Sequence, residues 1–128
     1  MILDSSALLA VIFREPEAPA LIKAMTANDC AISAANFFES RIVIQRRRKP
    51  DLMKALDDLI AGAPIEIVPF DASQAEIASV AYEKYGRGSG HKAGLNFGDC
   101  FSYALAKQRD EPLLAVGPEF AAAGLPRG

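Results

Sequence analysis

Short apolar runs alternate along the chain with longer stretches in which apolar residues recur every three or four positions. Four runs have the length of buried strands: 1–4, 30–32, 65–68 and 113–116. The longer stretches predict helices at about 5–13, 16–27, 34–48, 51–61, 72–85 and 96–109, and a short one after 117. Strands alternating with helices are typical of an α/β fold. We therefore expect a three-layer α/β/α sandwich with a short, mostly parallel central sheet, in which most crossovers carry two helices.

Residues at the expected helix boundaries support this division. Asp4 and Ser33 each stand directly after an apolar run and are good helix N-caps. Pro16 or Pro19 is suited to open the second helix, and Gly62 to end the fourth.

The helix expected at 34–48 has apolar residues around most of its circumference. These residues are Phe37, Phe38, Ile42, Val43 and Ile44. Such a helix is expected to be central and packed against several neighbours. Glu39 lies in the middle of it, so its carboxylate is expected to be buried or to line a cavity.

Composition limits the classes of protein that fit. A chain of 128 residues suits one domain, which we place at 1–128, and its net charge of −2 argues against a wholesale basic nucleic-acid binder. No apolar run is long enough to span a membrane, and Asp4 interrupts any signal-like start. Cys30 and Cys100 form no spaced motif and are expected to be free, buried thiols of a cytoplasmic protein.

Four acidic residues occupy comparable places. Asp4, Asp99 and Glu119 lie just after strands or in the first turn of a helix, and Glu39 lies in the helix after the second strand. Such positions share the carboxyl edge of a parallel sheet, where ligands of α/β proteins bind. Carboxylates favour Mg²⁺ or Mn²⁺, and His91, the only histidine, leaves no zinc cluster.

Each acid also has a purely structural interpretation. Asp4 is a helix cap, Asn96 and Asp99 have capping-box spacing, and Glu119 suits a first helical turn. A buried Glu39 is harder to explain in this way, because unpaired buried carboxylates are costly.

Basic side chains gather in two places. Arg46 and Arg47 belong to the run 46–49 at the end of a helix, and Arg87 and Lys92 lie in the glycine-rich segment 86–94 before Asp99. Both groups are candidates for contacts with RNA phosphates, and both also suit solvated surface charge. Tyr85 and Phe97 are candidates for stacking on bases, although core packing is the simpler expectation.

Three segments resemble the PIN-domain nucleases, and within them the VapC-type toxins of toxin–antitoxin pairs. They are 1–8 (MILDSSAL), 33–39 (SAANFFE) and 95–107 (LNFGDCFSYALAK), and EPLL at 111–114 also fits. The resemblance covers essentially the whole chain, and the third segment is the most specific.

The resemblance implies a Mg²⁺- or Mn²⁺-dependent endoribonuclease. Asp4, Glu39 and Asp99 would be its acidic metal-site residues, with Ser6 supporting the first acid by hydrogen bonding. The C-terminal part departs from the pattern: 117–120 (GPEF) replaces Gly-x-Asp-Phe, and 123–124 (AG) stands where Thr-Asp is common. Glu119 takes the fourth acidic role in this interpretation.

The resemblance also implies an RNA substrate, a cognate VapB-like antitoxin, and a homodimer or a toxin–antitoxin hetero-oligomer. Part of the apolar face of the first two helices would then bind the antitoxin or a second subunit. That face comprises Leu8, Leu9, Ile12, Phe13, Leu21 and Ile22.

Three rival functions stay open. A phosphatase with a strand-end aspartate nucleophile usually has a second acid two residues on, where this chain has Ser6. A housekeeping RNA-processing nuclease would have no antitoxin. A non-catalytic α/β domain that binds RNA or protein would use its acids only as helix caps.

Overall fold

The computed structural model describes residues 1–126, and within them the chain forms four short strands and seven helices. The strands are β1 (Ile2–Leu3), β2 (Ala31–Ser33), β3 (Glu66–Val68) and β4 (Leu113–Leu114). The helices are α1 (Ser5–Ile12), α2 (Ala18–Thr26), α3 (Ala34–Arg46), α4 (Pro50–Gly62), α5 (Ala72–Tyr85), α6 (Phe97–Arg109) and α7 (Glu119–Ala122). Each predicted element is present, with most boundaries within two residues of the prediction.

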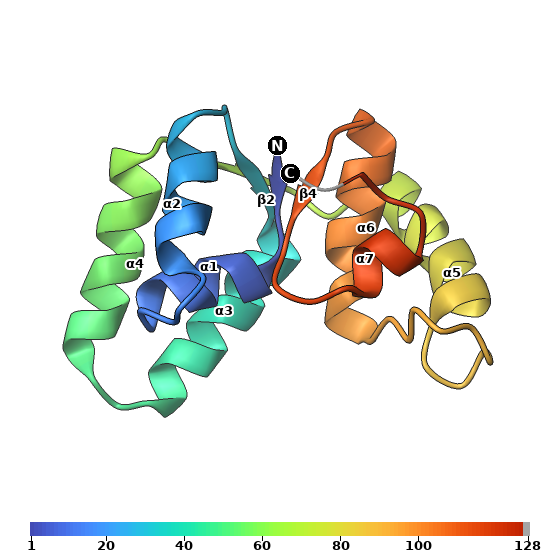
Figure 1. Ribbon diagram of the computed structural model, residues 1–128, viewed down its shortest axis with the longest axis horizontal. Coiled ribbons are helices and arrows are strands. Elements are labelled where there is room, and N and C mark those ends of the chain that lie inside the picture. The colour runs from blue at the N-terminus through green and yellow to red at the C-terminus, as the bar shows by residue number, and fades with distance from the viewer. Residues whose placement is uncertain (127–128) are drawn as a thin grey trace.

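The strands form one parallel sheet in the order β3-β2-β1-β4. Two helices connect each consecutive pair of strands, as predicted. Helices α1 to α4 lie on one side of the sheet and α5, α6 and α7 on the other (Figure 1). This arrangement confirms the expected three-layer sandwich, and it brings the carboxyl ends of all four strands to one edge.

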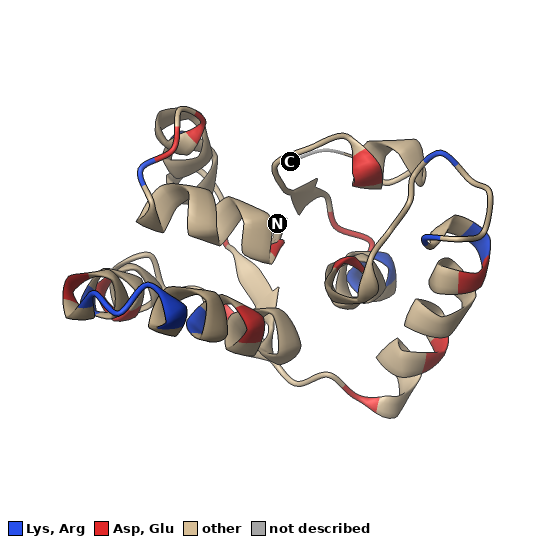
Figure 2. Ribbon diagram, turned by 90° about the horizontal axis from the view of Figure 1, so that it is seen from below, with Lys and Arg blue, Asp and Glu red and all other residues tan. Residues whose placement is uncertain are grey.

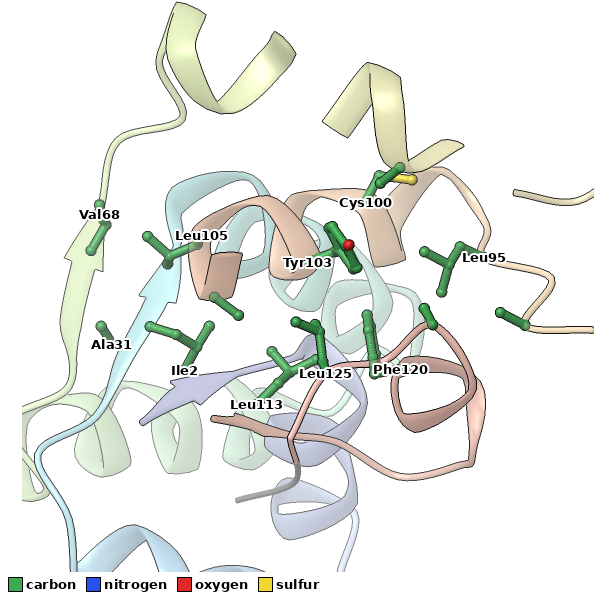
Figure 3. Packing of buried hydrophobic residues seen from close by; sticks show 14 residues of the cluster. Ile2, Ala31, Val68, Leu95, Cys100, Tyr103, Leu105, Leu113, Phe120 and Leu125 are labelled. Atoms are coloured by element: carbon green, nitrogen blue, oxygen red, sulfur yellow. The ribbon is translucent and has the colours of Figure 1, made fainter. Parts of the chain in front are cut away.

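The two sides of the sheet have separate apolar cores. Ile2 belongs to the core shared with α6 and the C-terminal segment, whereas its neighbour Leu3 belongs to the core shared with α1 to α4. Successive residues of a strand point to opposite faces, which explains the division. In Figure 3, Ile2 lies among Leu105, Leu113 and Leu125. Even a two-residue β1 therefore fixes both layers to the sheet.

Helix α3 does not have the predicted fully packed circumference. Its buried residues are Asn36, Ser40 and Ile44, which share one face, while the side chain of Phe38 is 64% exposed. The core-facing stripe of this helix is therefore partly polar. Its polar groups are tolerated because they are hydrogen-bonded: Ser40 Oγ donates to the Asn36 carbonyl at 2.9 Å, and Asn36 has the partners described below.

The apolar face of the first two helices is mostly core. Leu8, Ile12 and Leu21 are buried in the α1–α4 layer, whereas Ile22 is 44% exposed. The predicted partner-binding face is therefore mostly covered by the protein itself, and α4 is one of the helices that pack against α1.

The glycine-rich segment 86–94 is closed at its base by backbone hydrogen bonds. Arg87 N–H donates to the Leu95 carbonyl and Leu95 N–H to the Tyr85 carbonyl, each at 2.9 Å. The His91 ring packs edge-on against Tyr85, with 4.8 Å between centroids. The loop therefore leaves α5 and enters α6 at fixed positions, although a flexible segment was expected.

Cys30 and Cys100 are both buried and free, as the sequence predicted. Among the described residues, no helix combines the length and apolar character needed to cross a membrane.

Leu56 is the fully buried residue by which α4 packs onto its layer. Replacing it by alanine should lower the free energy of unfolding by about 2–5 kcal/mol, because a large buried side chain leaves a cavity. Urea denaturation followed by circular dichroism measures this loss. Leu52→Ala, one turn earlier and partly exposed, is the control and should cost less. Equal losses in the two variants would show that α4 does not pack through Leu56.

Candidate active site at the carboxyl edge of the sheet

Asp4 stands where β1 passes into α1, and it is 3% exposed. Its side chain caps the helix, since Oδ2 accepts from the Ser6 backbone N–H at 3.0 Å. Its Oδ1 contacts the Ser102 hydroxyl of α6. Burial raises the pKa of Asp4, hydrogen bonds from Ser102 and Ser6 oppose that rise, and the charge of Glu39 adds to it.

Ser102 connects Asp4 to α3. Its Oγ donates to Asn36 Oδ1 at 2.9 Å, and Asn36 Nδ2 donates to the Gly98 carbonyl at 3.0 Å and to Glu39 Oε1 at 3.3 Å. A serine hydroxyl has one hydrogen, so it cannot donate to Asp4 and Asn36 together. The chain of bonds is complete when Asp4 carries a proton and donates it to Ser102, which agrees with the raised pKa of Asp4.

Glu39 lies at the junction of three helices. The Ser5 hydroxyl of α1 donates to its Oε1 at 2.5 Å. On the side of α6, a Cβ added to Gly98 would lie 2.3 Å from Glu39 Oε2. Glycine at 98 therefore permits the Glu39 carboxylate to rest against the first turn of α6, next to Asp99.

Asp99 and Asn96 form the predicted capping box at the start of α6. Asp99 N–H donates to Asn96 Oδ1 at 2.8 Å, and Asn96 N–H donates to Asp99 Oδ2 at 2.9 Å. Burial raises the pKa of Asp99 to about 6, against the lowering effect of the Asn96 N–H. The charges of Asp4, Glu119 and Glu39 raise it further.

Glu119 is the first residue of α7, directly after the loop that leaves β4. A Cβ on Gly117 would lie 2.4 Å from Glu119 Oε2, and Gly117 has a φ of +102°, which favours glycine. The loop thus turns Glu119 back over its own backbone. Its charge acts on Asp99, which places it in the same acidic region as the other three.

The four predicted acids therefore share one edge of the sheet and one electrostatic field, seen from the strand ends in Figure 2. Their donor atoms are all carboxylate oxygens, which suit Mg²⁺ or Mn²⁺, and a cation would relieve the repulsion that raises the pKa of Asp99. In residues 1–126, no three His, Cys, Asp or Glu side chains are already gathered as a metal-binding cluster. In its donor chemistry and charge, the residue set fits a divalent cation.

Ser6 contributes to the site through its backbone as well as its side chain. Its N–H caps Asp4, and its Oγ accepts from the Val116 N–H at 3.0 Å, which ties α1 to the segment before Glu119. The supporting role of its hydroxyl toward Asp4 was predicted, but its bond to Val116 was not.

Three further residues were not recognised in the sequence: Ser5, Asn36 and Ser102. A signal for two of them was present, because Asn36 precedes Glu39 by three positions and Ser102 follows Asp99 by three. Residues three apart share a helix face, so a polar residue at that spacing from a site acid points to the same place.

The basic residues divide into different environments. Arg87 and Lys92 are exposed in the loop that leads to α6. Arg46 is exposed and borders a groove of about 410 Å³ between α3 and α6, which Glu39 also lines. The Arg47 guanidinium instead lies 4.1 Å from the centroid of the Phe13 ring, so this side chain packs on the end of α1. In Figure 2 the basic turn after α3 and the glycine-rich loop lie on opposite sides of the molecule.

Phe97 is 76% exposed, which contradicts the simpler expectation of core packing. It lines the same groove as Phe38 and Glu39, and it contacts Phe101 edge-on at 4.9 Å between centroids. Tyr85, by contrast, packs against Tyr103 and His91, as core packing predicts. An aromatic surface therefore borders the acidic edge on the side of α3.

Structures of known proteins share this architecture. VapC20 of Mycobacterium tuberculosis, described as a toxin that cleaves the sarcin-ricin loop, superposes with a TM-score of 0.74 at 16% identity, over 97% of this chain and 95% of that one. VapBC2 of Rickettsia felis, solved bound to a DNA fragment from its promoter, gives a TM-score of 0.77 at 16% identity, over 99% and 96%. At this level of identity the likeness concerns the fold.

Similarity in sequence extends to closer relatives. Ribonuclease VapC28 of M. tuberculosis is 46% identical over 128 residues, which cover 99% of this chain and 96% of that protein. Ribonuclease VapC of Mycolicibacterium smegmatis is 43% identical over 122 residues, covering 94% and 93%. The PIN domain model matches residues 1–125. The chain therefore belongs to the PIN-domain family and, within it, to the VapC ribonucleases.

Proposed function

We propose that this protein is a divalent-metal-dependent endoribonuclease, the toxin of a VapBC-type pair. The observation that carries the proposal is the acidic edge: a buried Asp4 together with Glu39, Glu119 and an Asp99 whose pKa all three other acids raise. Such a concentration of like charge is unfavourable in itself and becomes favourable with a bound cation. The relatives named as VapC ribonucleases support RNA as the substrate.

Asp4 and Asp99 would hold the cation, with Glu39 and Glu119 as direct or water-mediated ligands. One Mg²⁺ or Mn²⁺ ion, or a pair of ions, would supply a more acidic bound water and neutralise charge that develops on the phosphate. A carboxylate offers about four acceptor sites, so Asp4 can keep its bonds to Ser6 and Ser102 and still have lone pairs free for an ion.

The protein's own groups would position the substrate phosphate rather than react with it. The first turn of α6 lies at the site, and helix N-termini favour negative charge. Arg87 and Lys92 would contact phosphates on one side, and Arg46 on the side of α3. Arg47 is a weaker candidate because it packs on Phe13. The exposed ring of Phe97 is available for stacking on an unpaired base.

We propose a VapB-like antitoxin as partner, in a homodimer or a toxin–antitoxin hetero-oligomer. Support comes from similar folds solved as complexes, VapBC2 of R. felis and FitAcB of Neisseria gonorrhoeae. The latter superposes with a TM-score of 0.71 at 20% identity, over 99% of this chain and 96% of that one. An RNA-processing role without an antitoxin is the second candidate for the same site.

A phosphatase and a non-catalytic binding domain fit the acidic edge less well. The phosphatase mechanism would need a second acid at position 6, where the Ser6 hydroxyl instead binds the Val116 N–H. Asp4 and Asp99 do cap helices, as a non-catalytic domain would require. Capping leaves the burial of like charges at this edge unexplained, however.

Asp99→Asn should fold normally and lose roughly 100-fold or more of its RNA cleavage with Mg²⁺ or Mn²⁺, since it removes one metal-binding charge. The asparagine oxygen can still accept from the Asn96 N–H. Cleavage of a labelled RNA with defined ends measures the loss. The matched control is Asp71→Asn, which alters another capping aspartate at the start of α5 and should cleave like the wild type. Wild-type cleavage by Asp99→Asn would show that the site is wrong.

In chelator, the wild-type protein should become less stable as the pH rises from about 4 to above 6. The pKa of Asp99 is about 6 in the folded protein, against 3.8 for an ordinary aspartate, so the folded state binds more protons in this range and loses that advantage when the pH rises. Urea denaturation at several pH values measures the decline, expected to be on the order of 1–2 kcal/mol after solvent screening. Asp99→Asn should flatten it, and an equal decline in both proteins would contradict the raised pKa.

Replacing Arg87 and Lys92 with alanine should weaken RNA binding and reduce the salt dependence of the binding constant. Each lost contact to a single strand lowers the slope of log K against log salt by about 0.7. Fluorescence anisotropy in chelator, from low to high salt, measures the slope. Lys23→Ala with Lys54→Ala removes the same charge from α2 and α4 and should leave the slope nearly unchanged. The same slope in the loop variant and the wild type would exclude the loop as an RNA contact.

A further inference from the structure

We propose that Ser102 is a positioning residue of the active site, which holds the Asp4 carboxylate in the orientation required for metal binding and, through Asn36, couples it to Glu39. The inference rests on the proposed function. It assigns a role to two residues outside the acidic set.

The position of Ser102 is determined by the same helix that carries Asp99. The two residues are three positions apart on α6, so they share a face, and Ser102 is completely buried. From there its hydroxyl contacts Asp4 Oδ1, 98 positions away in the chain, and Asn36 Oδ1, 66 positions away. One hydroxyl therefore joins the end of β1, α3 and α6.

Asn36 carries the connection on to the second acid. It too is completely buried, and its amide hydrogens are directed to the Gly98 carbonyl and to Glu39 Oε1. Its oxygen therefore faces Ser102, which fixes the orientation of the amide group without ambiguity. The result is a continuous path of hydrogen bonds from Asp4 through Ser102 and Asn36 to Glu39.

This path restricts the rotation of both acids. Asp4 Oδ2 is held by the Ser6 N–H, so a second bond at Oδ1 fixes the plane of the carboxylate. Glu39 Oε1 is held by Ser5 and Asn36 together. Hydrogen bonds that orient metal ligands typically account for 10- to 100-fold in metal affinity or activity.

Ser40 provides a matched comparison within the same site region. It is also a completely buried helical serine, but its hydroxyl bonds only to the backbone carbonyl of Asn36 in its own helix. Ser102→Ala and Ser40→Ala thus remove the same atom from equally buried positions, and only the first removes a bond to an acid.

The test compares Ser102→Ala, Ser102→Thr and Ser40→Ala with the wild type. Measurements are Mn²⁺ affinity by calorimetry, kcat and KM for RNA cleavage, and urea denaturation to verify folding. Ser102→Ala should lose roughly 10-fold or more in Mn²⁺ affinity and in kcat, with KM for RNA within about two-fold, because RNA binding does not use Ser102. Ser102→Thr, which keeps the hydroxyl, should recover most of this loss, and Ser40→Ala should match the wild type.

Wild-type Mn²⁺ affinity and kcat in folded Ser102→Ala would overturn the proposal, as would an equal loss in Ser40→Ala. If Ser102→Ala does not fold, Ser102→Cys, which keeps the shape with a weaker donor, should show the same losses to a smaller extent, and wild-type values there would also overturn it. Failure of the wild type to cleave RNA would refute the proposed function, whereas the Mn²⁺ affinities would still decide the role of Ser102. Cleavage by the wild type that is lost in Asp99→Asn but unchanged in Ser102→Ala would refute the positioning role alone.

Discussion

The burial of the Asp4 carboxylate at the end of β1, within the field of other acids, is the constraint on which the rest of this edge depends. Desolvation and repulsion both disfavour its charged form. The fold responds with hydrogen bonds from separate elements: the Ser6 N–H at the start of α1 and the Ser102 hydroxyl from the middle of α6. Asp4 can be held there only if β1, α1 and α6 keep their relative positions.

Close approach of α3 and α6 follows from the same requirement. Glu39 Oε2 rests against Gly98, where a side chain of any size would displace it, and Asn36 binds the Gly98 carbonyl directly. Two helices from different layers thus meet at the strand ends over a glycine and a buried amide. The central place of β1 in the sheet order, between β2 and β4, brings both helices within reach of Asp4.

The sequence predicted the elements and the four acids because both are local signals. Strand-end acids such as Asp4 and the spacing of Asn96 and Asp99 can be recognised within a few residues. Asn36 and Ser102 were missed because their partners are 62 to 98 positions away. The face of α3 was also misjudged: a polar stripe can be buried when distant residues satisfy its hydrogen bonds, so apolar residues such as Phe38 are left outside.

Capping and metal binding are compatible roles for these acids, and each assists the other. Asp4 and Asp99 are held by backbone N–H groups at the starts of α1 and α6, where the helix dipole favours negative charge. That interaction offsets part of the repulsion before any cation binds, and it restricts the carboxylates to one orientation. An acid that only capped a helix would be better placed in solvent, away from other acids. Their concentration at one buried edge is the feature that capping alone leaves without a physical reason.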